Sequence, residues 1–137
     1  MATKLTSSNT VLVEVAPGEL IDKLTILEIK SERIEDPAKL QNVRIELDVL
    51  SEARDKSLGI SEALLQLTDQ LKIVNEQLWD IEDRIRICEN GNDFTDTFVE
   101  LARAVYKTND RRAALKREIN ELLGSRLVEE KDYEDYE

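Results

Sequence analysis

Residues 64–88 read LLQLTDQLKIVNEQLWDIEDRIRIC and decide the fold. The apolar residues of this stretch recur in alternating steps of three and four, at Leu64, Leu67, Leu71, Val74, Leu78, Ile81, Ile85 and Cys88. This 3.5-residue period predicts a long helix whose apolar stripe packs along another helix. The residues between the stripe positions are mainly charged or amide side chains, as expected for a solvent-exposed helix face.

The rest of the chain shows the same kind of periodicity, interrupted by short turns. Four helices are expected, over residues of about 17–34, 37–57, 61–89 and 94–123. We predict an all-α fold, in which a short antiparallel hairpin of the first two helices packs on a long antiparallel coiled-coil-like hairpin of the last two. We also predict a short extended segment before the first helix.

Residues at the predicted helix ends support these boundaries. Pro17 and Pro37 suit the first turn of a helix, and Asp36 and Ser61 suit N-caps. Gly59 can take the left-handed conformation at the end of the second helix, and Gly124 is expected to close the last helix.

The two ends of the chain differ from its helical part. Residues 1–125 are expected to form one helical domain, in which residues 1–10 are loose. Val11–Val15 resembles a strand, which would either lie extended against the helices or pair with its copy in a second chain. Residues 126–137 are expected to form a mobile acidic tail, although Tyr133 and Tyr136 could instead dock on a partner or on the bundle.

Composition excludes several functions. The 137 residues carry a net charge of −11, which argues against nucleic-acid binding by the whole surface. One Cys and no His exclude a disulfide framework, a Cys/His zinc site and a His-based triad within one chain. No apolar run is long enough for a membrane span. We therefore expect a cytoplasmic protein, and we predict neither a metal site nor a cofactor.

Two polar residues interrupt the apolar stripe of residues 94–123. The stripe runs through Leu101 and Val105, continues through Thr108 and Arg112, and becomes apolar again at Leu115. The unchanged phase favours one continuous helix over a break at residues 107–109. A charge in the stripe must be paired or reach water. The interruption therefore predicts either a structural ion-pair layer, with Glu76 or Asp80 within reach of Arg111 or Arg112, or a polar functional pocket.

The same region reverses the charge of the chain. Residues 103–117 contain six basic side chains and one acidic side chain, Asp110. Such a cluster could hold a phosphate, a nucleotide or an acidic surface. It could equally neutralise the acidic helix of residues 61–89 or pair with a second subunit.

Five segments resemble a family of small bacterial proteins that is classed only as a domain of unknown function. They are VEVAPGELIDKLTILEIK (13–30), LWDIED (78–83), FVELARAVYKTNDRR (98–112), IN (119–120) and EEKDY (129–133). Ala16 departs from the Ser expected there, which removes a helix cap. The resemblance implies no reaction, cofactor or catalytic residue. It does imply a bacterial source and a genomic setting of surface-glycan genes.

The resembling segments and the basic cluster together supply the candidate ligand-binding residues. We expect several of them to converge in a groove near the middle of the bundle. They are Asp22, Lys23, Glu28, Trp79, Glu82, Arg103, Tyr106, Lys107, Asn109, Asp110 and Arg111.

Two functions follow from this pattern. The favoured one is a non-catalytic binding or scaffolding module that acts through helical surfaces. The alternative is a small enzyme or a nucleotide- or phosphate-binding protein, with or without a dependence on Mg²⁺, that uses Arg111, Asp110, Asn109 and Tyr106. We expect a homodimer, because the helix of residues 17–34 has apolar residues on more than one side, and a further protein partner is compatible with either function.

Overall fold

The computed structural model describes residues 9–136, and this part of the chain contains four helices. They are α1 (Pro17–Arg33), α2 (Pro37–Ser57), α3 (Glu62–Asn90) and α4 (Asp96–Leu122). Every boundary lies within two residues of its predicted position. The predicted all-α fold is confirmed, and α4 is continuous through residues 107–109, as the unbroken phase of its stripe predicted.

Most of the predicted helix signals act as expected. Asp36 accepts a hydrogen bond from the Lys39 amide at 2.9 Å, and Ser61 accepts one from the Leu64 amide at 3.1 Å. Gly124 follows α4 with a φ of 65°. The prediction for Gly59 is wrong, because Leu58, which directly follows α2, is extended and Gly59 does not have a positive φ.

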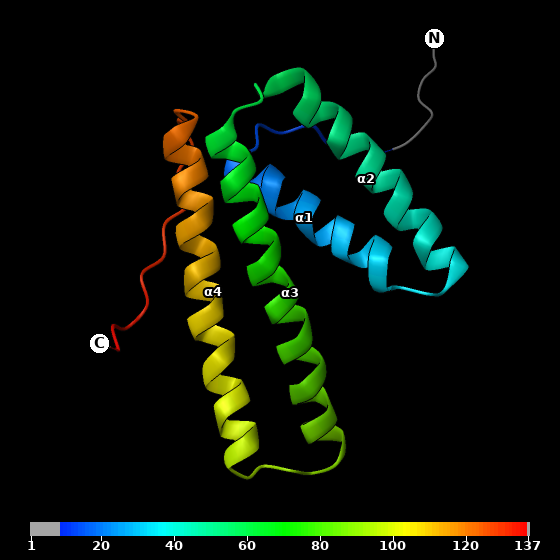
Figure 1. The fold of residues 1–137 in the computed structure, drawn as a ribbon, viewed down its shortest axis with the longest axis vertical. Helices are drawn as coiled ribbons and strands as arrows, with labels where there is room; N and C mark the ends of the chain where they lie inside the picture. The colour runs from blue at the N-terminus through cyan, green and yellow to red at the C-terminus, as the bar shows by residue number, and fades with distance from the viewer. Residues whose placement is uncertain (1–8, 137) are drawn as a thin grey trace.

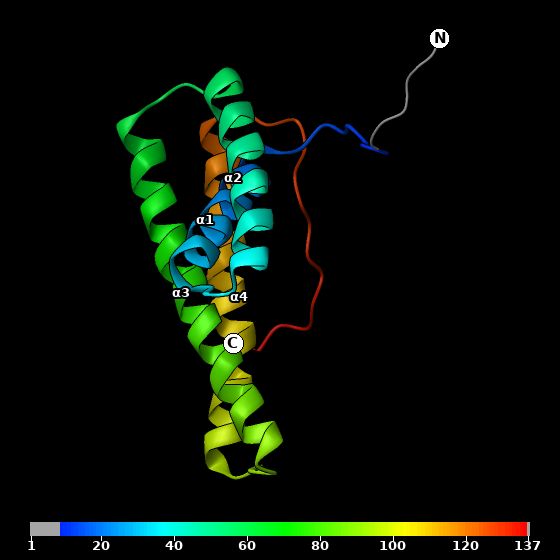
Figure 2. The same ribbon diagram turned by 90° about the vertical axis from the view of Figure 1, so that its right-hand side faces the viewer.

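The long hairpin of α3 and α4 supports the other two helices (Figures 1 and 2). Helix α1 crosses this hairpin and contacts both of its helices, whereas α2 packs against α1 alone. Helix α1 is therefore the only helix among residues 9–136 that contacts all three others. This position explains why its sequence carries apolar residues on more than one side.

The apolar core lies where α1 meets the hairpin. Its buried residues are Ile21, Leu24, Leu64, Leu71, Val74, Leu115 and Ile119. Within α1, Ile21, Leu27 and Ile29 are each only 1% exposed. The apolar surface of α1 is thus covered within one chain, which removes this reason to expect a homodimer.

A glycine lets α1 begin in direct contact with α4. The Gly18 amide donates a buried hydrogen bond to Asn120 Oδ1 at 2.7 Å. A β-carbon at position 18 would lie 2.3 Å from the Lys116 carbonyl oxygen, which is far inside van der Waals contact. Only a residue without a side chain allows this approach.

The segment before α1 does not form the predicted strand. Residues 9–16 have no regular secondary structure, and Val11, Leu12 and Val13 are 81%, 91% and 72% exposed. These side chains therefore do not pack on the helices, and pairing with a second copy stays a prediction. The predicted looseness of residues 1–8 lies outside the described residues.

The segment after α4 turns back along that helix (Figure 1). Arg126 pairs with Glu14, and the Tyr136 ring packs edge-to-face on Tyr106 with 5.3 Å between centroids. Of the two predicted tyrosine contacts, docking on the bundle is therefore seen for Tyr136. Mobility of this segment stays a prediction. No helix within residues 9–136 is long and apolar enough to cross a membrane.

Replacement of Gly18 by alanine should destabilise the fold by about 1–3 kcal/mol, because the added methyl group must push α1 away from α4. Urea unfolding followed by circular dichroism measures this change. Gly59→Ala is the matched control, since no atom outside residues 58–60 lies within 4 Å of the place where its new methyl group would sit. Equal unfolding midpoints for the two variants would contradict the close approach of α1 to α4.

Candidate functional site

A buried polar layer joins α1, α3 and α4. We define it as Asp22, Thr25, Asn75 and Arg112. Asp22 is 1% exposed and accepts two hydrogen bonds from Arg112, from Nε to Oδ1 at 2.9 Å and from Nη2 to Oδ2 at 2.6 Å. Such a two-pronged contact is the strongest form of the arginine–carboxylate pair.

Asn75 completes this layer from α3. Its Nδ2 donates to Asp22 Oδ1 and to Thr25 Oγ1, both at 2.9 Å. Thr25 Oγ1 in turn donates to the Asp22 carbonyl oxygen at 2.7 Å. The Asp22 carboxylate thus receives three hydrogen bonds from two helices, which offset the cost of burying its charge.

The predicted ion-pair layer exists, but with a different acidic partner. The hydrogen bond with Asp22 raises the pKa of Arg112 further, although partial burial of the guanidinium opposes this rise. Asp80, one of the two predicted partners, instead pairs with Arg33 at 2.7 Å. The prediction considered only the α3–α4 hairpin, whereas the actual partner comes from the crossing helix α1.

A cavity of about 420 Å³ lies beside the buried polar layer, and we call it the central groove. It is lined by Ile26, Ile29, Asn75, Leu78, Trp79, Glu82, Asp83, Arg86, Asn109 and Arg112. Helix α1 contributes only apolar side chains to this lining, α4 contributes only polar ones, and α3 contributes both kinds, with Leu78 and Trp79 as its apolar members. Glu82 pairs with Arg86, and the Arg33 guanidinium lies 5.8 Å from the centre of the Trp79 ring.

Four of the predicted site residues are at or beneath the central groove. Trp79, Glu82 and Asn109 line it, and Asp22 holds Arg112 at its edge. The convergence of residues from α1, α3 and α4 was expected from the sequence. The prominence of Arg112 was not, since the sequence left it open between a structural ion-pair layer and a polar pocket, and only the neighbouring Arg111 was among the candidate ligand-binding residues.

The remaining predicted residues lie elsewhere. Lys23 pairs with Glu46 of α2 at 2.9 Å, and Arg111 donates to Gln77 of α3 at 2.8 Å. Tyr106 and Asp110 contact the segment after α4. Three more residues lie outside the lining of the central groove, namely Glu28, which is partly buried, and the exposed Arg103 and Lys107.

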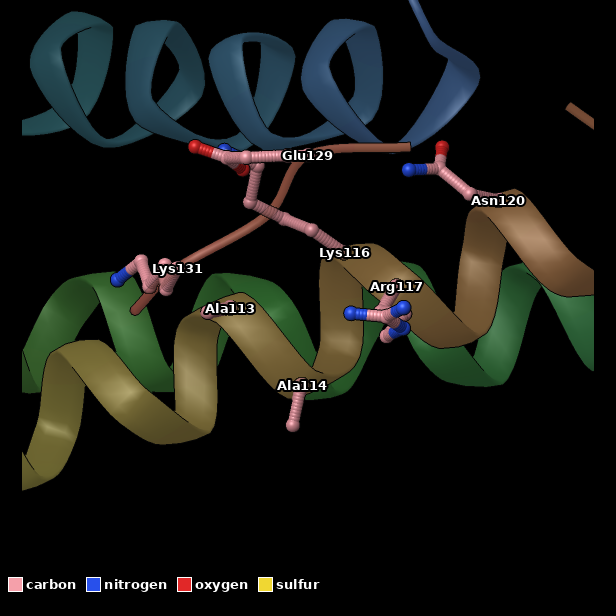
Figure 3. A pocket seen from close by; sticks show the side chains of 7 residues that line it. All are labelled: Ala113, Ala114, Lys116, Arg117, Asn120, Glu129 and Lys131. Carbon is pink, nitrogen blue, oxygen red and sulfur yellow. The ribbon is translucent and has the colours of Figure 1, made fainter. Parts of the chain in front are cut away.

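A second polar cluster was missed by sequence reasoning. Lys116 is buried and pairs with Glu19 of α1 at 2.8 Å and with Glu129 at 2.9 Å. Figure 3 shows Lys116 and Glu129 meeting above α4, at the edge of a cavity of about 190 Å³. Lys116 directly follows the stripe residue Leu115, but nothing in the sequence indicates its two partners.

The charges of this cluster perturb one another. Burial opposes the charge on Lys116, but the hydrogen bonds with Glu19 and Glu129 outweigh it and raise the Lys116 pKa. The hydrogen bond from Lys116 lowers the pKa of Glu129. Both side chains therefore remain charged around neutral pH. Within residues 9–136, no three His, Cys, Asp or Glu side chains gather in a way that could hold a metal ion.

The Arg112→Gln substitution should destabilise the protein by about 3 kcal/mol, because it leaves the buried Asp22 carboxylate without a counter-charge. Arg111→Gln is the matched control. It removes the same charge from the next residue, which is exposed, and should cost at most about 0.5 kcal/mol. Urea unfolding of both variants checks the prediction, and similar midpoints would show that the buried pair is not needed for stability.

Acid should release the contact between Lys116 and Glu129. The folded-state pKa of Glu129 lies below its ordinary value of 4.5, so this contact stabilises the docked segment above pH 4.5. The contribution is lost as the pH falls through the lowered pKa. NMR shifts of residues 129–136, followed from pH 7 to pH 3, should show this release, and Glu129→Gln should show it already at pH 7. Unchanged shifts in the variant at pH 7 would count against the contact.

Comparison with known proteins gives one match. No curated protein and no solved structure matches this chain. A family model described as a family of unknown function, DUF6165, matches residues 11–136, which is nearly the whole chain. The resemblance seen in the sequence is thereby confirmed, and the chain belongs to this family of unknown function.

Proposed function

We propose that this chain is a non-catalytic binding module whose ligand site is the central groove between α1, α3 and α4. One observation carries the proposal: the buried polar layer holds Arg112 in a single orientation at the edge of the groove. Two of its nitrogens are bound to Asp22, while Nη1 makes no hydrogen bond within residues 9–136. A guanidinium positioned in this way is prepared to receive an anionic group.

The chemistry of the buried layer favours binding over catalysis. A guanidinium does not give up its proton in proteins, so Arg112 can orient a ligand but cannot act as a general acid or base. The Asp22 carboxylate is occupied by three hydrogen bonds from Arg112 and Asn75. The two strongest polar groups near the groove, Asp22 and Arg112, are therefore bound to each other and fix the geometry of the site.

The lining indicates what kind of small molecule would fit. Arg112 and Asn109 offer hydrogen-bond donors to an anionic group, and Glu82 and Asp83 offer acceptors to a cationic one. Ile26 and Ile29 offer an apolar wall to the body of the ligand. This arrangement favours a small molecule that carries both an anionic and a cationic or donor group, such as an amino acid.

A thermal-shift screen tests this proposal. Free amino acids and related amphoteric molecules should raise the melting temperature, and a ligand at about 100 times its Kd stabilises by roughly 2.7 kcal/mol. Asn109→Ala should weaken the response, because it removes a donor from the groove. Asn42→Ala makes the same change at an exposed position of α2 and should leave the response unchanged. A response that is equal in both variants would place the ligand outside the groove.

The same screen distinguishes the binding module from the alternative function, a small enzyme or a nucleotide- or phosphate-binding protein. For this reason it includes nucleotides, nucleotide sugars, simple phosphates and Mg²⁺. Three of the four residues proposed for that function, Tyr106, Asn109 and Asp110, line one cavity between α4 and the segment after it, whereas Arg111 contacts α3. A nucleotide- or Mg²⁺-dependent shift that disappears in Arg111→Ala would nevertheless favour a small enzyme or a nucleotide-binding protein over the binding module.

The proposal also includes the oligomeric state of the protein, its partners and its cellular and genomic setting. A homodimer is supported by the exposed apolar side chains of residues 11–13, and the mass in solution tests it. A further protein partner, a cytoplasmic location and the bacterial surface-glycan setting implied by the resemblance are proposed together with it.

A further inference from the structure

Residues 129–136, which we call the C-terminal segment, contact α4 at two places. At one end, Glu129 pairs with Lys116 at 2.9 Å and Glu130 pairs with Arg117 at 3.1 Å. At the other end, the Tyr136 hydroxyl donates to Asp110 Oδ2 at 2.6 Å. The segment therefore runs antiparallel to α4.

The α4 residues that receive these contacts form a distinct surface, which we call the docking face. It consists of Tyr106, Asp110, Lys116 and Arg117. It presents two cations near the end of α4, and a tyrosine ring with a carboxylate about two turns earlier. The charges thus match an extended peptide that carries acidic residues followed by a tyrosine.

The attachment of the C-terminal segment is loose. The segment has no regular secondary structure, and each of its residues is exposed. Exposed ion pairs such as Arg117–Glu130 contribute little to stability. The segment is therefore held by a few side chains, with no helix or sheet hydrogen bonding along its backbone.

A cavity of about 720 Å³ lies between the C-terminal segment and α4. It is lined in part by Tyr106, Asn109 and Tyr133. The segment therefore touches α4 near its two ends and does not pack closely on it in between.

We propose that the docking face binds an extended acidic segment of a partner protein, in which a pair of acidic residues precedes a tyrosine. The C-terminal segment occupies this face in the free protein and competes with the partner. Because it is tethered, its effective concentration is high, and a partner must displace it to bind. This surface is separate from the central groove, so it adds a second binding activity to the proposed function.

Peptide binding by the full chain tests the proposal. The probe is a fluorescein-labelled peptide with blocked ends and the sequence of residues 127–136, LVEEKDYEDY, in which Glu129 and Glu130 precede both tyrosines. In the triple variant Glu129→Gln, Glu130→Gln, Tyr136→Ala, the resident segment loses the contacts described above with the docking face. Fluorescence anisotropy should show at least tenfold tighter peptide binding by this variant than by the unmodified chain.

Further variants establish where the peptide binds. Adding Arg117→Glu to the triple variant should weaken binding at least tenfold, whereas adding Arg84→Glu, the same charge change at an exposed position of α3, should not. A scrambled peptide of the same composition should bind at least tenfold more weakly. Circular dichroism confirms that each variant stays helical.

Three results would overturn the proposal. Equal affinity of the unmodified chain and the triple variant would show that the C-terminal segment does not compete. Equal effects of Arg117→Glu and Arg84→Glu would show that the docking face is not the binding surface. Equal binding of the scrambled peptide would show that charge alone drives the association. None of these results bears on the central groove.

Discussion

The pairing of Asp22 with Arg112 is the interaction on which the rest of this structure depends. A carboxylate that is 1% exposed is tolerated in the core only because a guanidinium from another helix neutralises it through two hydrogen bonds. This requirement determines where α1 crosses the α3–α4 hairpin, because only one register brings the two groups together. The central groove lies at that crossing, so its shape and the orientation of Arg112 follow from the same pair.

Further contacts along α1 reinforce this crossing. At its start, Gly18 allows a close approach to α4 and donates to Asn120. Towards its end, Glu32 pairs with Lys72 at 2.7 Å, and Arg33 pairs with Asp80. Helix α2, by contrast, packs only on α1. A rigid crossing helix beside a polar groove is suited to positioning a ligand, because its side chains need little reorganisation on binding.

Local and periodic features were predictable from the sequence, and contacts between distant elements were not. The helix boundaries and the continuity of α4 followed from apolar spacing and capping residues, whose effects act within a few residues. The partner of Arg112 depends on the crossing of α1, which no periodicity encodes. Arg111 and Arg112 are neighbours in sequence but differ by about 100° around the helix, so one faces the groove and the other faces Gln77. Docking of Tyr136 on the bundle was one of the alternatives that the sequence left open, but the α4 partners of Glu129 and Tyr136 were not predictable, because an acidic tail has the same composition whether docked or mobile.

Native-state amide hydrogen exchange of α1 tests the role of the buried pair most directly. If the pair makes α1 part of the central cooperative unit, the amides around Asp22 should exchange only through global unfolding, with the same free energy as those around Leu71 in α3 and Ile119 in α4. The amides of α2 should exchange at a lower free energy, since α2 packs on α1 alone. Exchange of α1 together with α2, at a free energy below that of the α3–α4 hairpin, would contradict the central role of the Asp22–Arg112 pair.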